Sequence, residues 1–427
     1  MAYGDDIDAL NCDHRWSFDN TYLDLVGTSP GTGSGWDFPA TPLCRDATYA
    51  GRSNATTDRV SIPTTTDINN SAQSRKAVGG WFSYSAAQGP PKRIYGEGNQ
   101  TTAFHFAGFI GNNVMFEVID SGFDVQIYGF YLEDDRAYHL LGMFSGNGYD
   151  NEVKFFIDGV EMTNANPSDR QPDTATLSAR GVAEFADPAG TVGIGGGTVL
   201  LNAPVNGLYN EWATWDGANA ALSDTDIRVE LFEKGALADL TISSSDETGM
   251  QAQLDLVAST SRSNAPCCIE IEEFSTGDDY ELLSNGVYFN ELSSIHYRYN
   301  GTGSLTIINT SGSNADIISS PWGSASLKTQ VDVEIIVKDL SDFSFVSGAR
   351  VYIEATGSGD VADETVILNE LTDASGSVST TFNYLNGQEI TGYVRQGTNS
   401  IYYQQGDIAG PISSDGLSET VLLIRDE

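Results

Sequence analysis

The sequence predicts an all-β protein, and three observations support this class. Short segments such as 138–144 and 153–157 have the length and apolar patterning of partly buried strands. The Asp158-Gly159 pair that follows them is typical of a tight turn between antiparallel strands. The chain also holds 45 glycines, with 40% hydrophobic and only 19% charged residues, which indicates many turns and enough apolar surface for a core.

The length predicts several domains. A chain of 427 residues exceeds what one typical hydrophobic core supports. Changes in pattern place the boundaries so that the domains span 1–236, 237–328 and 329–427.

The first domain contains a series of aromatic and apolar strand segments. They are 14–20, 81–84, 114–119, the pair 138–144 and 153–157, and a closing strand around Trp212. The polar stretch 162–190 is predicted as a long loop. A short helix is predicted over 223–233, because Ser223 can cap it and Asp226 stands three residues further on.

In their order along the chain, these segments resemble the laminin G-like, concanavalin A-like jelly roll. That fold is used mostly to hold sugars or proteins. The resemblance implies a jelly-roll sandwich in 1–236 and a surface-binding role, and it does not name the ligand.

The middle domain is predicted to be small and mainly β, with one helix. Met250, Leu254 and Val257 recur at helical spacing within 246–259. Four strand-like segments follow at 268–271, 280–283, 294–299 and 304–309. Such strands form a small sheet or stack as a short β-solenoid, and the missing sequence repeat favours the small sheet.

The third domain is predicted to be a β-sandwich. A strand at 331–337 is followed by Gly348-Ala349-Arg350-Val351 and then by Thr372-Asp373-Ala374-Ser375-Gly376. This pattern resembles the immunoglobulin-like or transthyretin-like modules of cell-surface and phage proteins. Gly348 and Gly376 are expected at turn positions with positive φ.

The charge excludes some partners. The 59 acidic and 21 basic residues give a formal net charge of -38, which repels phosphate backbones and anionic lipid. We therefore expect no nucleic-acid partner and no membrane partner. No apolar run of about 18 residues marks a membrane span. The acids are spread along the chain, which favours solubility over a dedicated cation or basic docking site.

The four cysteines indicate neither a disulfide framework nor a zinc site. Cys12, Cys44, Cys267 and Cys268 are expected as reduced thiols, although the first two could meet within the first domain. No Cys-x-x-Cys pair occurs, so a zinc site has no support in the sequence.

The laminin G-like resemblance implies that Ca²⁺ could bind at the rim of the sandwich. The candidate metal ligands are the carboxylates of Asp134, Asp135 and Asp158, and for Asp158 the alternative role is turn chemistry.

Sugar sites need exposed aromatic planes beside amides and carboxylates. Trp36 in a glycine-rich segment is the best loop aromatic, and Tyr95 and Asn99 follow around Gly96-Glu97-Gly98. These three residues are the carbohydrate-binding candidates. Packing in the core is the alternative role for Trp36.

We predict no enzyme. Jelly rolls of the laminarinase type carry their catalytic acids as Glu-x-Asp-x-x-Glu on one strand, and residues 1–236 lack this spacing. Glu211 on the closing strand is expected to point outward. Glu270 and Glu272 share a face but are expected on a surface strand of the second domain.

The leading functional hypothesis is a non-enzymatic bacteriophage virion surface protein: a capsid decoration, a head fibre or a tail component. It would contact other virion proteins and host-surface glycans through the jelly-roll loops, as a homo-oligomer. The opening segment 1–6 lacks the apolar core of a signal peptide, which is why a virion surface is the expected location. The alternatives are a bacterial surface adhesin, a structural cement protein without ligand, and a polysaccharide hydrolase.

Overall fold

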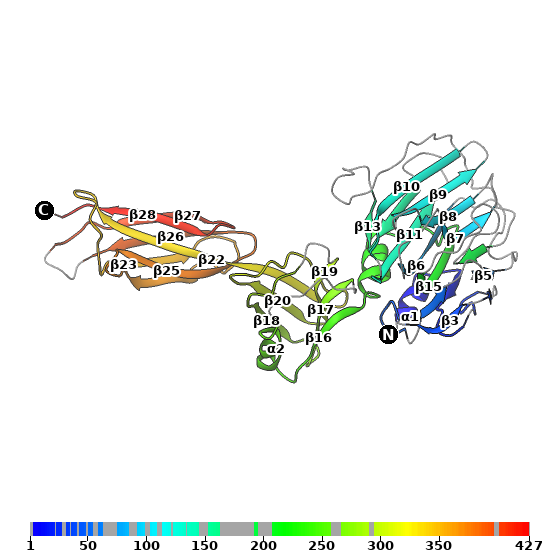
Figure 1. Cartoon of the computed structure of the whole chain (residues 1–427). Helices are drawn as coiled ribbons and strands as arrows, with labels where there is room; N and C mark the ends of the chain where they lie inside the picture. Colours follow the sequence, from blue (N-terminus) through cyan, green and yellow to red (C-terminus); the bar gives the residue numbers. More distant parts are fainter. Residues whose placement is uncertain are drawn as a thin grey trace. The chain divides into compact units, whose positions relative to one another are not determined.

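The computed structural model describes most of the chain. The described residues are 3–21, 23–27, 31–34, 36–40, 42–47, 50–53, 59–62, 75–84, 92–98, 103–108, 113–120, 123–133, 135–144, 153–162, 192–194, 207–257, 266–289, 294–396 and 401–426. The strands outnumber the helices throughout, so the all-β prediction is confirmed (Figure 1). Nearly all of the predicted 162–190 loop lies outside the described residues.

The chain divides into two compact units. Unit 1 comprises 1–241, 262–270 and 292–295, and unit 2 comprises 242–261, 271–291 and 296–427. β16 (Ala238–Ile242), β17 (Cys267–Glu272) and β19 (Ile295–Asn300) begin in unit 1 and end in unit 2. The three-domain division stays a prediction.

Unit 1 is a sandwich of two antiparallel sheets. The first sheet has the order β13 (Val160–Glu161), β12 (Val153–Ile157), β11 (Tyr138–Phe144), β6 (Lys76–Tyr84), β15 (Gly207–Asp216), β4 (Ala50–Ser53) and β3 (Asp37–Ala40), with β1 (His14–Trp16) also paired to β15. The second has the order β10 (Phe123–Tyr131), β9 (Asn113–Asp120), β8 (Ala103–Gly108), β7 (Lys92–Gly98), β14 (Val192–Ile194), β5 (Arg59–Ile62) and β2 (Thr32–Ser34).

The predicted hairpin is present. β11 and β12 pair antiparallel, with Leu140 opposite Ile157. Asp158 and Gly159 then form a two-residue turn from β12 to β13, with φ of 52° and 72°. Both angles lie in the left-handed region that such turns require, and glycine adopts it without steric cost.

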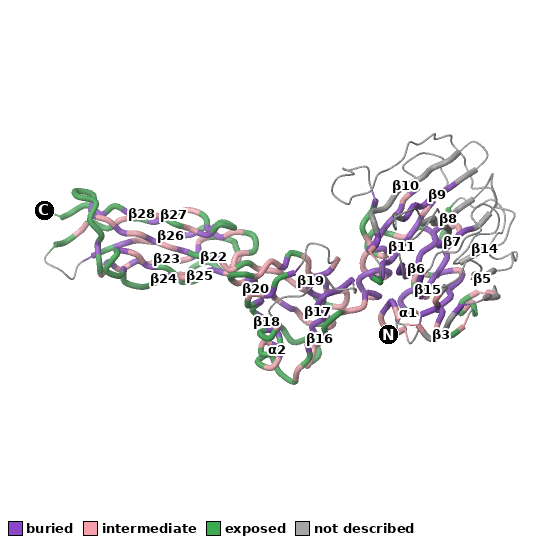
Figure 2. The backbone as a smooth tube through the Cα atoms, viewed as in Figure 1, coloured by how far each residue is buried: buried purple, intermediate pink, exposed green. Residues whose placement is uncertain are grey.

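Both faces of the first sheet are buried. Alternate residues of β6 point to opposite sides: Val78 and Phe82 join the core between the sheets, whereas Ala77 and Trp81 join a second core. Strands of this sheet, including β6 and β15, appear as purple tubes in Figure 2. A Cβ at Gly80 on β6 would lie 2.5 Å from the Trp212 side chain on β15, so only glycine fits at this position.

Two helices contribute side chains to the second core. α1 (Tyr3–Ala9), which the sequence did not predict, contributes Tyr3 and Ile7, and the π-helix η3 (Asp226–Glu233) contributes Leu231 and Phe232. The predicted 223–233 helix is thus present. The predicted capping pair is also present, at the helical turn 224–225 that leads into η3: the Asp226 backbone N–H donates to Ser223 Oγ at 3.1 Å, and the Ser223 N–H donates to Asp226 Oδ2 at 2.7 Å.

Unit 2 begins with α2 (Glu247–Leu254), capped by Asp246, and continues with stacked parallel strands. β18 (Asp279–Ser284), β20 (Ser304–Asn309) and the first half of β22 (Ser324–Asp339) pair in parallel, and β19 pairs in parallel with β21 (Ile318–Ser319). The structure therefore has the stacked arrangement that the sequence favoured less. Apolar residues lie opposite one another across these strands, as Leu282, Ile307 and Leu327 do. Such stacking requires apolar residues at matching strand positions, and it does not require a longer repeat in the sequence.

The rest of unit 2 is a β-sandwich, as predicted, which we call the C-terminal sandwich. β22 continues past residue 329 between β25 (Ser377–Tyr384) and β28 (Leu417–Leu423). The second sheet has the order β24 (Val366–Leu371), β23 (Arg350–Ala355), β26 (Gln388–Arg395) and β27 (Gly406–Ile412). Gly348 and Gly376 have φ of 74° and 69°, which confirms their predicted turn positions.

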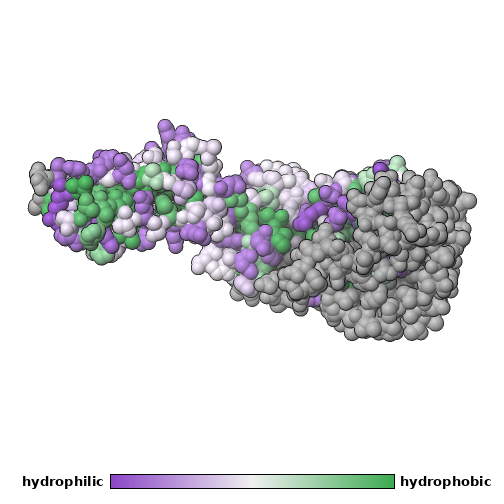
Figure 3. Space-filling view, turned by 90° about the horizontal axis from the view of Figure 1, so that it is seen from above, coloured by the Kyte–Doolittle hydropathy of each residue, from purple (hydrophilic) through white to green (hydrophobic). Residues whose placement is uncertain are grey.

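The surface of unit 2 is mixed. Green apolar side chains lie among purple polar ones on the C-terminal sandwich in Figure 3, and Leu340, Phe343 and Phe345 are among the exposed apolar residues of this part. Among the described residues, no helix is long and apolar enough to cross a membrane.

Candidate functional site

The indole of Trp36 is buried, which contradicts the expectation of an exposed loop aromatic. Only 7% of the residue is exposed, and its ring lies 4.9 Å from that of Tyr209 and 5.1 Å from that of Phe18. The flanking glycines suggested an open loop, but β3 begins directly after Trp36 and carries the side chain into the core between the sheets. In this conformation the ring has no open face for a sugar.

Tyr95 is also a core residue, so it too cannot stack on a sugar here. It lies on β7, is fully buried, and stacks on Trp212 with ring centroids 5.7 Å apart and planes at 9°. Asn99 lies outside the described residues. The structure therefore does not bring the three predicted sugar-binding residues together at an open surface.

The three predicted calcium ligands are not assembled either. Asp134 lies outside the described residues, and Asp135 is exposed with φ of 60°. Asp158 is buried and engaged by other groups. Within the part of the chain that the structure describes, no group of three His, Cys, Asp or Glu side chains has the arrangement of a metal site. Calcium binding stays a prediction.

Asp158 anchors three segments of unit 1 to one another. One carboxylate oxygen accepts the backbone N–H of His139 at 2.9 Å. The other accepts Arg136 Nη2 at 3.1 Å and Ser294 Oγ at 2.7 Å. Burial raises the pKa of Asp158, and the positive charge of Arg136 opposes that rise. Asp158 therefore has two roles: its backbone forms the turn after β12, and its carboxylate links these segments.

Glu211 points inward, so the expectation that it faces solvent is wrong. Its backbone has φ of 44°, a left-handed value that is unusual for this residue type, and the register of β15 against β6 shifts between Asn210 and Ala213. Because of this bulge, simple alternation along the strand does not predict the direction of the side chain. The residue is only 8% exposed.

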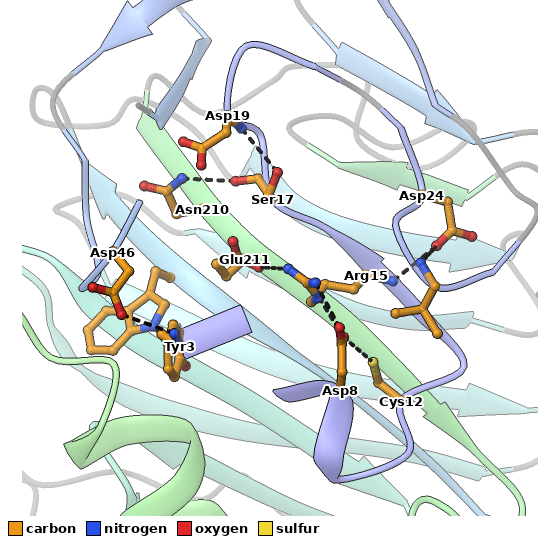
Figure 4. Close-up of polar contacts among 12 residues, drawn as sticks. Tyr3, Asp8, Cys12, Arg15, Ser17, Asp19, Asp24, Asp46, Asn210 and Glu211 are labelled. Carbon is orange, nitrogen blue, oxygen red and sulfur yellow. Dashed lines mark hydrogen bonds and ion pairs between the residues drawn. The ribbon is translucent and has the colours of Figure 1, made fainter. Parts of the chain in front are cut away.

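The Glu211 carboxylate belongs to a buried polar network around Arg15, which lies on β1. Arg15 Nη1 donates to Glu211 Oε2 at 2.9 Å. The same guanidinium donates to both oxygens of Asp8 on α1, at 2.7 and 2.9 Å (Figure 4). One cation therefore holds two carboxylates from separate elements, Glu211 through one bond and Asp8 in a forked, two-bond geometry, which is the strongest form of such a pair.

Burial and charge act together in this network. Burial raises the pKa of Glu211, and the neighbouring Arg15 lowers it in part. Burial disfavours the charged form of Arg15, but its bonds to Asp8 and Glu211 outweigh this and raise its pKa. Burial and the charge of Asp8 raise the pKa of Cys12 to about 12, so its thiol is protonated and unreactive at neutral pH.

A second set of contacts attaches helix α1 to the same sheet. Trp81 Nε1 donates to Tyr3 Oη at 3.0 Å, and the Tyr3 backbone N–H donates to Asp46 at 3.1 Å. Nearby, the Asn210 amide donates to the Ser17 carbonyl at 2.9 Å and accepts the Leu43 N–H at 2.8 Å. The sequence did not predict the roles of these residues, and their one local signal is the mix of acids and Arg15 in 5–15.

The arrangement indicates a structural role for these carboxylates. A retaining or inverting glycosidase needs an acid and a second carboxylate that face a sugar across an open cleft. Here Asp8 on α1 and Glu211 on β15 instead share one guanidinium, that of Arg15. All four cysteines are buried and free, which confirms the prediction of reduced thiols.

Comparisons with known proteins show no family for this chain. No family model matches the chain, and no curated protein matches it. Among solved structures, domain 4 of AbnA, a GH43 extracellular arabinanase from Geobacillus stearothermophilus in complex with arabinotriose, is 18% identical, with 52% of this chain and 98% of that chain covered and a TM-score of 0.36.

Two further similarities are of the same size. Trypanosoma rangeli sialidase in complex with sialic acid is 11% identical over 51% of this chain and 32% of its own, with a TM-score of 0.35. The receptor-binding domain of botulinum neurotoxin C/D mosaic serotype is 12% identical over 51% and 50%, with a TM-score of 0.37. The sheets described above define the chain as a β-sandwich protein.

Proposed function

We propose that this chain is a non-enzymatic binding protein whose jelly roll contacts glycans on a surface. The observation that carries the proposal is the pairing of buried and partly buried acids in unit 1. Glu211 binds Arg15 at 2.9 Å, Asp158 binds Arg136 at 3.1 Å, and Asp216 lies 3.6 Å from Lys76. Carboxylates held in this way stabilise a rigid scaffold and are not placed to transfer protons to a substrate.

The burial pattern limits which surfaces of unit 1 are open to a ligand. One face of the first sheet contributes to the core between the sheets, and the other packs against α1 and η3. Aromatic side chains of this sheet, such as Trp81 and Trp212, are therefore used for packing, and so is Tyr95 on β7 of the second sheet. We therefore expect glycan contact on the connections between strands and not on this sheet.

We further propose that the protein acts at a virion surface, with other virion proteins as partners and in several copies. The modular order supports this setting: a jelly roll, parallel stacked strands and a C-terminal sandwich form a scaffold that can present a binding domain. Several copies would strengthen a weak sugar site through avidity. A bacterial surface adhesin and a cement protein without ligand are the competing functions.

The test combines a glycan array with an assay for released sugar, both on the full chain. We expect glycan binding and no released oligosaccharide. Release of oligosaccharide from any bound polysaccharide would overturn the non-enzymatic proposal. Tight binding to capsids without binding to any glycan would support the cement function instead, and immunogold labelling of phage particles tests the virion setting.

A further inference from the structure

Two arginines face each other on the outer side of the C-terminal sandwich. Arg350 on β23 lies directly opposite Arg395 on β26 in the antiparallel register. Like charges in directly opposite positions destabilise a sheet unless something compensates them. Their juxtaposition is conspicuous in a chain that has 59 acidic residues available and only 21 basic ones.

Neutral groups hold both guanidinium groups in place. Arg350 Nη1 donates to the carbonyl of Asn369 at 3.2 Å and to its side-chain oxygen at 3.1 Å. The Arg395 guanidinium lies 5.2 Å from the centre of the Tyr393 ring. Among the described residues, neither arginine forms an ion pair with a carboxylate. The two charges are therefore oriented but not neutralised.

A stacked pair of tyrosines lies in the next row of the same face. Tyr352 and Tyr393 are opposite each other, with ring centroids 5.3 Å apart and planes at 21°. Tyr352 Oη donates to Glu354 Oε2 at 2.6 Å, which fixes this ring. Each tyrosine supports the next group, so Tyr352 orders Tyr393 and Tyr393 orders Arg395. Such ordering before binding lowers the entropy cost of binding a ligand.

We propose that this face binds an acidic glycan through a sugar carboxylate held between Arg350 and Arg395. Guanidinium groups bind carboxylates in a forked, two-bond geometry, and arginine is the residue best suited to this. The tyrosine edges and the Asn369 amide supply the aromatic and hydrogen-bonding contacts that a sugar ring needs. The site lies outside the jelly roll, so it goes beyond the proposed function and does not depend on it.

The overall negative charge does not prevent this binding. Charges further away than the Debye length of about 8 Å are largely screened at physiological salt. The nearby acids also have partners: Glu354 accepts Tyr352, and Asp407 on β27 accepts Gln405 Nε2 at 3.2 Å. Glu354 and Asp407 keep their negative charges, but among the described residues neither forms an ion pair with Arg350 or Arg395, so both guanidinium groups keep N–H donors for a ligand.

The experiment measures binding of trigalacturonate, with neutral trigalactose for comparison, by isothermal titration calorimetry of the full chain at low salt. We expect the acidic trimer to bind and the neutral one to bind at least tenfold more weakly. The double substitution R350Q/R395Q should weaken trigalacturonate binding at least tenfold. The control K328Q/K338Q, which removes the same charge from β22, should change it less than twofold.

Equal binding of the two trimers, or an unchanged affinity in R350Q/R395Q, would overturn the proposal. Full competition by inorganic sulfate at a concentration equal to that of the trimer would also overturn it, since the site would then bind anions without recognising sugar. If R350Q/R395Q unfolds, R350K/R395K keeps both charges and loses the forked geometry. It should still bind several-fold more weakly, and undiminished binding would contradict the proposed geometry.

Discussion

Arg15 and Glu211 join the start of the jelly roll to its closing strand. Their atoms Nη1 and Oε2 lie 2.9 Å apart, although the residues are 196 positions apart in the sequence. The same guanidinium also binds Asp8, so helix α1, β1 and β15 are connected through one buried cation. The N-terminal segment is therefore an integral part of the sandwich.

Removing Arg15 should be costly. In R15M, Glu211 stays buried without its partner, and we expect unit 1 to lose about 3–5 kcal/mol of unfolding free energy. Urea unfolding followed by tryptophan fluorescence measures this, because five of the six tryptophans lie in unit 1. The double variant R15M/E211M should regain much of the loss.

The exposed pair Lys154–Glu161 is the matched control for this ion pair. Its atoms lie 3.3 Å apart and both side chains are 40% exposed, so E161Q should cost no more than about 1 kcal/mol. A loss in R15M as small as that in E161Q would show that the buried network contributes little to stability.

Ser294 should stabilise unit 1 through Asp158. The substitution S294A removes a hydroxyl that donates to Asp158 at 2.7 Å and accepts from Arg136 at 2.7 Å. Since the Asp158 carboxylate is buried, we expect a loss of about 1–3 kcal/mol in urea unfolding. T21A, which removes an exposed hydroxyl of the same unit, should stay within about 0.5 kcal/mol, and an equal effect of both variants would refute the role of Ser294.

Trp36 should matter for stability. Because its indole packs against Phe18 and Tyr209, we expect W36A to cost about 3–5 kcal/mol and W36F clearly less. Thermal and urea unfolding measure both variants. An unchanged melting temperature together with weaker glycan binding would instead favour an exposed, sugar-stacking Trp36.

His139 should make unit 1 sensitive to acid. Burial against Trp81 lowers the pKa of His139 from an ordinary 6.5 to about 3. As the pH falls from 6.5 toward 3, the unfolded chain binds a proton that the folded chain does not, so stability decreases by up to about 1.4 kcal/mol per pH unit.

The difference between the wild type and H139F isolates this effect. The raised pKa values of Asp158 and Glu211 act in the opposite direction, because a carboxyl that binds its proton more readily when folded favours folding as the pH falls. We expect H139F to lose less stability than the wild type between pH 6.5 and pH 4. Parallel stability curves would contradict a neutral, buried His139.

Local patterns predicted the local structure of this chain. Period-two segments placed most strands, the Ser223–Asp226 spacing predicted the capping bonds of the helical turn that leads into η3, and Gly348 and Gly376 marked turns with positive φ. These features depend on residues close together in the sequence. Their physical causes, which are side-chain alternation, capping and backbone sterics, act within a few residues.

The site residues and the strand directions depended on contacts between distant segments. Alternation is the same in parallel and antiparallel strands, so the stacking of β18, β20 and β22 could not be read from it. The glycines around Trp36 indicate an open loop, but packing against Phe18 and Tyr209 buries the indole. The inward turn of Glu211 follows from a bulge in β15 and from an arginine on β1. Burial and charge pairing are properties of the packed chain, and for that reason only the tertiary structure separated scaffold residues from candidate binding residues.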